Sequence, residues 1–322
     1  MKNERETAPN ATGVVVGVDI GGSKTALLVT DVATGEDVAQ DRFPTETAAG
    51  ATANLEKLYE AVHGAIKGAG REPGDLRALG IAVPGCVDAQ QGRVIRAGNL
   101  TGWRDLPLRD LASRALRVPV FVENDANAAA LGEKWRGAAK QMHNFAFLAL
   151  GTGVGVGLVI NGRLHHGFHE AAGEAGNFIM GRRFLGKERG GHGNLELLVG
   201  GPAIRRQART ISGHDLSVAE VFQDASTSKP LARLAGRVAD YLAITVINIA
   251  ALLDPEAVIL GGGTAMAGEP LLERIRARLD RELALVPALM ASALGEDAQL
   301  HGAVFGALWQ LDPSRALREE LR

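Results

Sequence analysis

The chain has 322 residues, of which 46% are apolar and 22% charged, so it is long enough for two packed domains and is not a disordered chain. Its formal net charge of −2 excludes a bulk attraction to nucleic acid or acidic lipid, and its one cysteine, Cys86, excludes an internal disulfide. No apolar run reaches the roughly 18 residues of a membrane span, and the polar start MKNERETAPN lacks a leader segment, so the sequence predicts a cytoplasmic protein.

Strands and helices alternate along the N-terminal half of the chain. Residues 1–12 are polar and are expected to form a disordered tail. The β-branched run at 14–19 predicts a strand, and a glycine-rich turn separates it from a second strand at 26–29. Apolar spacing then predicts, in chain order, a helix at 55–66, a strand at 79–83, a helix at 107–116, a strand at 118–122 and a helix at 126–135.

The second half repeats the form of the first, although not its sequence. A strand at 145–150, a glycine turn and a strand at 156–160 match the opening unit, and residues 161–194 are expected to be irregular. The elements predicted after them are a helix at 231–253, a strand at 257–260 and helices at 271–283 and 303–310. This pattern predicts an α/β chain with mixed sheets in two halves, divided near residues 122–124.

Glycine is over-represented, with 41 residues where average usage of about 7% would give roughly 23. Three clusters follow predicted strands, namely Gly21-Gly22-Ser23-Lys24-Thr25, Gly151-Thr152-Gly153-Val154-Gly155 and Gly261-Gly262-Gly263. Such turns present backbone N–H groups to phosphate, although each by itself is also typical of a plain tight turn. Their spacing matches neither a GxxxxGK[ST] loop nor a dinucleotide fingerprint, so together they predict a different kind of nucleotide site.

Two carboxylates lie at the ends of predicted strands. Asp19 precedes the first glycine cluster, where it is either a turn former or a group that holds hydrated Mg²⁺ against phosphates. Asp125 lies between a strand and a helix, where it is either a helix cap or the group that orients a reacting hydroxyl and accepts its proton.

The irregular region holds most of the histidines. His165, His166, His169 and His192 lie there without an HExxH or paired-cysteine pattern, which favours solvated or hydrogen-bonded loop residues over a metal site. Taken alone, Glu174 in this region is typical of a surface residue.

The motif Asp19-Ile20-Gly21-Gly22-Ser23-Lys24-Thr25 resembles the first phosphate motif of the ROK family (repressors, open reading frames and kinases), in the actin/hexokinase/Hsp70 fold group. The resemblance covers nearly the whole chain from about residue 14. It continues through Pro84-Gly85, Asn99-Leu100, Val122-Glu123-Asn124-Asp125-Ala126-Asn127-Ala128-Ala129-Ala130-Leu131-Gly132-Glu133, Gly151-Thr152-Gly153-Val154-Gly155, Ala172-Gly173-Glu174-Ala175-Gly176 and Leu260-Gly261-Gly262-Gly263.

This resemblance implies a two-domain actin-like ATPase (ribonuclease H-like) fold, an α/β fold with mixed sheets and a cleft between the domains. The small domain is expected to comprise residues 13–122 plus 301–322, and the large domain residues 123–300. The resemblance further implies an ATP-dependent sugar kinase that acts as a homodimer, with the conversion of glucose to glucose 6-phosphate as the first candidate reaction.

The resemblance also assigns roles to particular residues. The family's Glu-Asn-Asp motif places the catalytic base on Asp125. Implied sugar contacts come from Asn99, Asn124, Asp125, Glu174, Asn177 and Glu196. Mg²⁺ is expected to be held through water by Asp19. ATP is expected to be bound by Asp19, Gly21, Gly22, Ser23, Lys24, Thr25, Gly151, Thr152, Gly153, Gly261, Gly262 and Gly263.

One departure from the family pattern is large. Most members carry a structural zinc held by the His of Gly-Glu-x-Gly-His and by the cysteines of Cys-x-Cys-Gly-x-x-Gly-Cys-x-Glu. Here Asn177 stands at the His position, and Lys187, Arg189 and Asn194 stand at the cysteine positions. Because cationic Lys and Arg cannot ligate zinc, we expect this chain to bind none. Since the family's His also contacts the sugar, Asn177 leaves the choice of sugar open.

The sequence leaves other functions open. The acceptor could instead be fructose, an N-acetyl or amino sugar or a cyclitol, the donor could be polyphosphate, or the chain could be a sugar-sensing regulator without catalysis. Family repressors carry an N-terminal helix-turn-helix domain, and about 13 residues precede the first strand here, too few for one. This favours a kinase whose partner is a small sugar and not nucleic acid.

Overall fold

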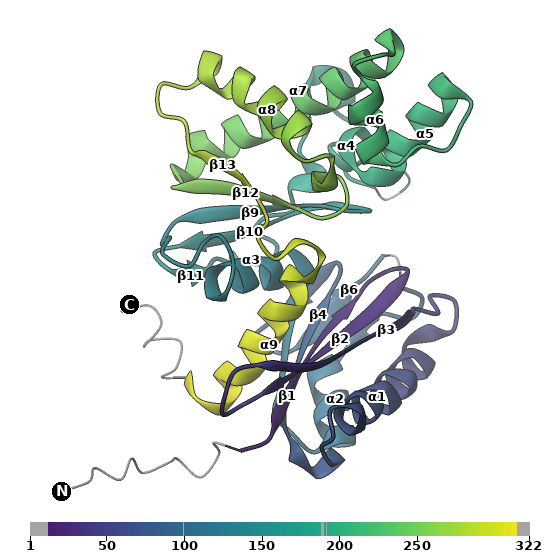
Figure 1. The fold of residues 1–322 in the computed structure, drawn as a ribbon, viewed down its shortest axis with the longest axis vertical. Helices are drawn as coiled ribbons and strands as arrows, with labels where there is room; N and C mark the ends of the chain where they lie inside the picture. The colour runs from purple at the N-terminus through teal and green to yellow at the C-terminus, as the bar shows by residue number, and fades with distance from the viewer. Residues whose placement is uncertain (1–11, 99, 188–189, 191, 314–322) are drawn as a thin grey trace, which may run out of the picture. The chain divides into compact units, whose positions relative to one another are not determined.

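The computed structural model describes residues 12–98, 100–187, 190 and 192–313. The chain divides into two compact units, Met1–Trp135 with Gln299–Arg322, and Arg136–Ala298 (Figure 1). The expected tail lies outside the described residues except for Thr12.

The first unit reaches further along the chain than the division that the sequence predicted near residues 122–124. Helix α3 (Asp125–Trp135) belongs to it because α3 packs on α9 (Ala298–Leu311). A Cβ on Gly302 would lie 1.7 Å from the carbonyl oxygen of Ala128, and the ring of Trp135 lies 6.0 Å from that of Phe305. These contacts join α3 to the C-terminal helix.

A mixed five-stranded sheet forms the centre of the first unit. Its strands, in spatial order, are β3 (Asp37–Pro44), β2 (Lys24–Asp31), β1 (Val14–Ile20), β4 (Leu76–Val83) and β8 (Val120–Asn124). Strands β3, β2 and β1 are antiparallel, whereas β1, β4 and β8 are parallel. A small sheet of β5 (Cys86–Asp88), β6 (Arg93–Arg96) and β7 (Arg104–Leu106) accompanies it.

Both faces of this sheet are buried. Consecutive side chains of β1 point to opposite faces, and nearly all of them are buried. Val14 and Val16 pack against α1 (Gly50–Gly68) and α2 (Leu108–Leu116) on one face, whereas Val15 packs against α9 on the other (Figure 1). A Cβ on Gly80 would lie 1.8 Å from the carbonyl oxygen of Ala303. Glycine in β4 therefore allows the α9 backbone to lie close to the sheet.

The second unit repeats this sheet topology and confirms the repeat of form. Its strands, in spatial order, are β11 (Arg163–Leu164), β10 (Val154–Ile160), β9 (Phe145–Leu150), β12 (Ala257–Gly261) and β13 (Ala288–Ala291). As in the first unit, an antiparallel hairpin is followed by parallel neighbours. Its helices are α4 (Glu196–Val199), α5 (Gly201–Ser212), α6 (Val218–Asp224), α7 (Lys229–Leu253) and α8 (Glu269–Glu282).

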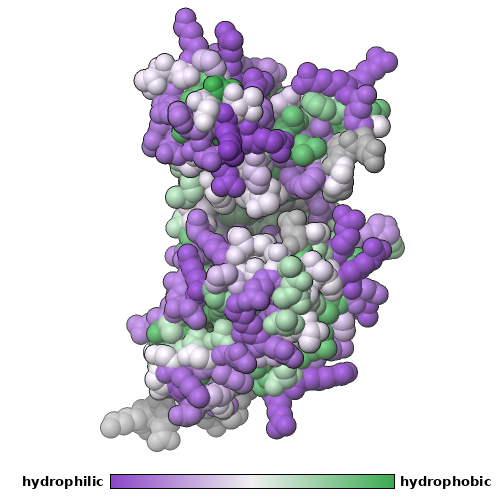
Figure 2. All heavy atoms as spheres, turned by 90° about the vertical axis from the view of Figure 1, so that its right-hand side faces the viewer, coloured by the Kyte–Doolittle hydropathy of each residue, from purple (hydrophilic) through white to green (hydrophobic). Residues whose placement is uncertain are grey.

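Helix α7 supplies much of the core of the second unit. Its buried residues, among them Leu234, Val238 and Leu242, pack with residues of β9, β12 and α8. By length and composition α7 could also cross a membrane, which is weak evidence because core helices pass the same test. Hydrophilic side chains cover most of the face drawn in Figure 2, and apolar ones occur among them in small groups.

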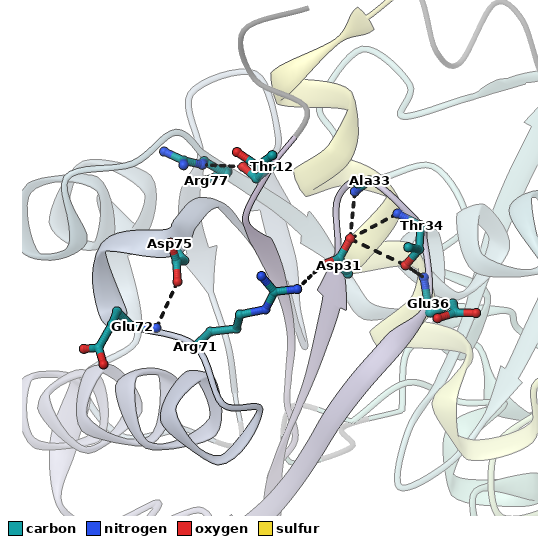
Figure 3. A network of polar contacts seen from close by, with 9 residues as sticks. All are labelled: Thr12, Asp31, Ala33, Thr34, Glu36, Arg71, Glu72, Asp75 and Arg77. Carbon is teal, nitrogen blue, oxygen red and sulfur yellow. Dashed lines mark hydrogen bonds and ion pairs between the residues drawn. The ribbon is translucent and has the colours of Figure 1, made fainter. Parts of the chain in front are cut away.

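A polar network closes the turn after β2 (Figure 3). The carboxylate of Asp31 accepts hydrogen bonds from the backbone of Ala33 at 2.9 Å and of Thr34 at 3.0 Å, and Arg71 donates from Nη2 at 2.6 Å. The Thr34 amide, the Ala33 amide and the Arg71 charge lower the pKa of Asp31, against the opposing effect of burial. Asp31 therefore links the β2–β3 turn to the residues after α1.

Candidate active site

The carboxyl ends of β1, β4 and β8 meet at one edge of the first sheet, because these strands are parallel. Asp19 pairs with Ala82, and Ala82 in turn pairs with Glu123. Asp125 follows Glu123 by two residues along the chain. Asp19 and Asp125 therefore lie at the same sheet edge, and both residues are half-buried. The structure brings these two sequence-predicted carboxylates to one side of the first unit.

Asn124 holds the junction between β8 and α3. Its Oδ1 accepts hydrogen bonds from the backbone N–H groups of Ala126 at 2.9 Å and Asn127 at 3.2 Å, and its Nδ2 donates to the carbonyl oxygen of Gly85 at 2.8 Å. Asn124 is thus the residue that caps α3, a role that the sequence left open for Asp125. Asp125 begins the helix, and its Oδ1 accepts a hydrogen bond from Ala126 at 2.8 Å.

Glu123 is a buried residue that supports this junction by hydrogen bonds. The sequence assigned it no role. Glu123 is only 2% exposed. Its Oε1 accepts hydrogen bonds from the backbone N–H of Asn124 at 2.9 Å and from Nδ2 of Asn127 at 3.0 Å. A glutamate followed four residues later by an asparagine across a strand-to-helix junction is the signal that could have identified the pair. The buried acid orients the backbone that carries Asp125.

The first glycine cluster is the tight turn between β1 and β2. The Gly21 N–H donates to the carbonyl oxygen of Lys24 at 2.9 Å. The Thr45 N–H donates to the Ser23 carbonyl at 3.0 Å, and the hydroxyls of Thr25 and Thr45 lie 2.8 Å apart. Gly22, Ser23 and Lys24 are exposed at the tip, directly after Asp19 and Ile20. This turn can present backbone N–H groups to an anion.

The other two glycine clusters lie together at one edge of the second sheet. Gly261 pairs with Ala149, so the loops that follow β12 and β9 start side by side. The Thr264 N–H donates to the Leu150 carbonyl at 2.8 Å, and the Gly201 N–H donates to the Gly151 carbonyl at 2.9 Å. A Cβ on Gly151 or Gly263 would meet no atom within 4 Å. Gly151 and Gly263 therefore border open space, and neither backbone is covered where a side chain would lie.

Glu196 lies beside the β9–β10 turn of the second unit. A Cβ on Gly153 would lie 2.9 Å from Oε2 of Glu196. Its Oε1 lies 2.7 Å from Nδ1 of His192, a residue to which the sequence assigned no role. The carboxylate is thus close to a predicted phosphate turn and paired with an imidazole.

The remaining expected sugar contacts belong to the loop after β11 or lie outside the described residues. Glu174 and Asn177 are exposed, at the start and the end of one short 3₁₀ turn, and the Asn177 N–H donates to the Glu174 carbonyl at 3.1 Å. Gly173 has a φ of +84°, and a Cβ there would lie 1.8 Å from the Val156 carbonyl oxygen. This glycine places Glu174 next to β10. Asn99 lies outside the described residues.

The loop in which the family resemblance implies zinc ligands is held here by other contacts. Oδ1 of Asn194 accepts a hydrogen bond from the Met180 N–H at 2.8 Å, and Asn194 is 3% exposed. The Leu195 N–H donates to the Gly176 carbonyl at 2.9 Å, and a Cβ on Gly193 would lie 2.1 Å from that same oxygen. Lys187 is exposed and Arg189 lies outside the described residues. The described part of the chain contains no group of three or more acidic, histidine or cysteine side chains placed to hold a metal ion.

The chain is similar to a known protein family over most of its length. The model of the family described as "ROK family" matches residues 15–310. The chain belongs to the ROK family. A ROK relative, the glucokinase of Halalkalibacterium halodurans, is 34% identical over 279 residues, which is 81% of this chain and 83% of the relative. The xylose repressor of Caldicellulosiruptor bescii is 28% identical over 82% of this chain and 69% of its own length.

A solved structure supports the fold assignment of this ROK protein. The ROK glucokinase from Streptomyces griseus, determined in complex with glucose and AMPPNP, is 31% identical and superposes with a TM-score of 0.78 over 92% of this chain and 99% of the other. The fold is therefore the actin-like ATPase fold with mixed sheets, as the family resemblance implied.

Proposed function

We propose that this ROK protein is a cytoplasmic, homodimeric sugar kinase that phosphorylates the 6-hydroxyl of glucose with ATP and Mg²⁺. The observation that carries the proposal is the position of Asp125, a half-buried carboxylate at the carboxyl edge of β8, where Asn124 caps the helix that Asp125 begins. The cap fixes the start of the helix that carries Asp125, and a carboxylate held at a strand end is suited to orient a hydroxyl and accept its proton. Glucokinases among the relatives support a phosphoryl acceptor of this class.

In this proposal Asp125 accepts the proton of the sugar hydroxyl. The hydroxyl oxygen forms a bond to the γ-phosphorus of ATP, the bond from that phosphorus to the β-phosphate oxygen breaks, and ADP leaves with the electron pair. Asn124 and Glu196 contact sugar hydroxyls, and so do Asn99, Glu174 and Asn177. Precise positioning and stabilisation of developing charge supply most of the rate.

The residues present fit MgATP as the phosphoryl donor. Asp19 offers oxygen atoms of the kind that Mg²⁺ prefers, and it would hold the ion through water beside the turn of Gly21, Gly22, Ser23, Lys24 and Thr25. When bound, the ion would neutralise charge on the transferring phosphoryl group. The turn of Gly151, Thr152 and Gly153 would contact phosphate, and Gly261, Gly262 and Gly263 would flank the adenosine. Open space at Gly151 and Gly263 supports both assignments.

A panel experiment tests the proposal. ADP release is measured with MgATP and glucose, mannose, fructose, glucosamine, N-acetylhexosamines or a cyclitol, and polyphosphate replaces ATP in a parallel set. Glucose-dependent ADP release supports the proposal, and turnover with another acceptor or with polyphosphate alone would replace it with that kinase.

The xylose repressors among the relatives favour one further candidate, a sugar-sensing regulator. Isothermal titration calorimetry with the same sugars separates the two. Sugar binding without ADP release from any acceptor would support the regulator and overturn the kinase.

A further inference from the structure

The side chains of His192 and Glu196 form a close pair four residues apart. Nδ1 of His192 lies 2.7 Å from Oε1 of Glu196, and the side chains are 55% and 25% exposed, respectively. An ionised carboxylate only accepts hydrogen bonds, so Nδ1 carries the proton and donates it. The imidazole therefore holds one of the two carboxylate oxygens of Glu196 in place.

The other carboxylate oxygen of Glu196, Oε2, lies close to two glycines from different loops. A Cβ on Gly153, in the β9–β10 turn, would lie 2.9 Å from Oε2, and a Cβ on Gly176, after Glu174, would lie 3.7 Å from it. Neither residue has a side chain that could hold this oxygen. Oε2 therefore lies between the loop expected to contact phosphate and the loop expected to contact sugar.

The backbone of this region is well anchored, but the backbone contacts do not orient the carboxylate. The Leu195 N–H donates to the Gly176 carbonyl, the Gly193 backbone lies against the same carbonyl, and the Met180 N–H donates to Asn194. Helix α4 begins at Glu196 and has only four residues. A glutamate side chain has several rotatable bonds, and holding it in one rotamer requires a contact at its end.

We propose that His192 is a positioning residue that fixes the Glu196 carboxylate so that Oε2 can accept a hydrogen bond from a hydroxyl of the acceptor sugar. This inference rests on the proposed function, in which Glu196 contacts the sugar. In this role His192 orders the end of a loop in which the cysteines implied by the family resemblance are absent. A preorganised acceptor binds more tightly because less rotamer entropy is lost on binding.

The test compares steady-state kinetics of His192 variants. His192→Leu removes the donor and is expected to raise the KM for glucose about tenfold, the equivalent of one charge-assisted hydrogen bond, while kcat and the KM for ATP change less than about twofold. His192→Asn places an amide N–H where Nδ1 was and is expected to restore most of the affinity. His214→Leu alters an exposed histidine of the same unit and serves as the matched control.

Glu196→Gln, alone and combined with His192→Leu, separates the inference from the proposed function. Glu196→Gln is expected to raise the KM for glucose, and His192→Leu to add little to it. If Glu196→Gln raises this KM and His192→Leu does not, the positioning role is wrong and the kinase proposal stands. If neither changes it while glucose is still phosphorylated, Glu196 is not a sugar contact and the inference is overturned. If the unaltered protein phosphorylates no sugar, the proposed function fails and the inference fails with it.

Discussion

The side-chain amide of Asn124 joins the end of β8 to the turn after β4, because its Nδ2 donates to the carbonyl oxygen of Gly85 at 2.8 Å. The same side chain caps α3 through Oδ1. Asn124 therefore determines where Asp125 lies relative to two parallel strands. Gly85 has a φ of +94°, and a Cβ there would lie 2.2 Å from the Arg96 carbonyl oxygen, so its backbone is held in place as well.

Replacement of Asn124 separates these two contacts. Asn124→Ala is expected to lower the free energy of unfolding by about 2 kcal/mol, since a helix cap and a neutral hydrogen bond contribute about 1 kcal/mol each. Asn124→Ser keeps an oxygen that can cap the helix and is expected to cost about half as much. Urea unfolding of both variants checks the difference, and equal stability of Asn124→Ala and the unaltered protein would contradict the assignment.

Asp125→Asn tests the proposed base. The amide is isosteric with the carboxylate but cannot accept the hydroxyl proton, so turnover is expected to fall by orders of magnitude while sugar binding survives. Turnover is measured by ADP release and binding by calorimetry. Asp110→Asn, at an exposed position of α2, is the control. Near-normal turnover in Asp125→Asn would remove this residue from the role.

Gly262 and Gly263 offer a matched pair in the loop after β12. Gly262 has a φ of +84°, and a Cβ there would lie 2.7 Å from the Leu150 carbonyl oxygen, whereas a Cβ on Gly263 meets no atom within 4 Å. Gly262→Ala is therefore expected to lower the melting temperature and weaken ATP binding, because the backbone must shift. Gly263→Ala is expected to keep the melting temperature of the unaltered protein. Differential scanning fluorimetry with and without ATP checks both variants, and equal melting of the two would refute this account.

Asp31 should make the stability of the protein depend on pH in a defined direction. Its pKa is lowered below the ordinary value of 3.8, first by the Thr34 amide and then by the Ala33 amide and Arg71. The ionised form is therefore stabilised by folding, so this contribution is fully present above the unfolded pKa and is lost as the pH falls through the folded pKa.

Asp31→Asn is expected to lower the melting temperature at pH 7, and this difference should shrink as the pH falls below about 4. Melting temperatures of both proteins across this range provide the measurement. Asp41→Asn, at an exposed position of edge strand β3, serves as the control. A difference that stays constant down to the lowest pH would argue against the carboxylate contacts as its cause.

Metal analysis tests the expectation about zinc. Purified protein is expected to contain no stoichiometric zinc, because Asn177, Lys187 and Asn194 stand at ligand positions and Asn194 already accepts a hydrogen bond from Met180. Inductively coupled plasma mass spectrometry gives the ratio of zinc to chain. One zinc per chain would refute the expectation, and addition of a chelator should leave the melting temperature unchanged.

Local pattern predicted much of the fold. The β-branched run at β1, the apolar spacing of α1 and the glycine turn after β9 each lie where the sequence placed them, because burial of alternating or helical faces leaves a periodic trace. Strand β3 was missed because it is an edge strand whose side chains are mostly exposed, and it carries no such trace.

The sequence by itself determined the order of the elements, the repeated strand–turn–strand form and the family motifs, since these are local along the chain. Only the tertiary structure decided that α3 packs with α9 and that Asn124, not Asp125, caps α3. It also decided that His192 contacts Glu196, whose carboxylate lies close to Gly153. Each of these depends on register between distant segments or on the rotamer that a side chain adopts among competing partners. Those choices are made by packing, which residue type and spacing alone do not specify.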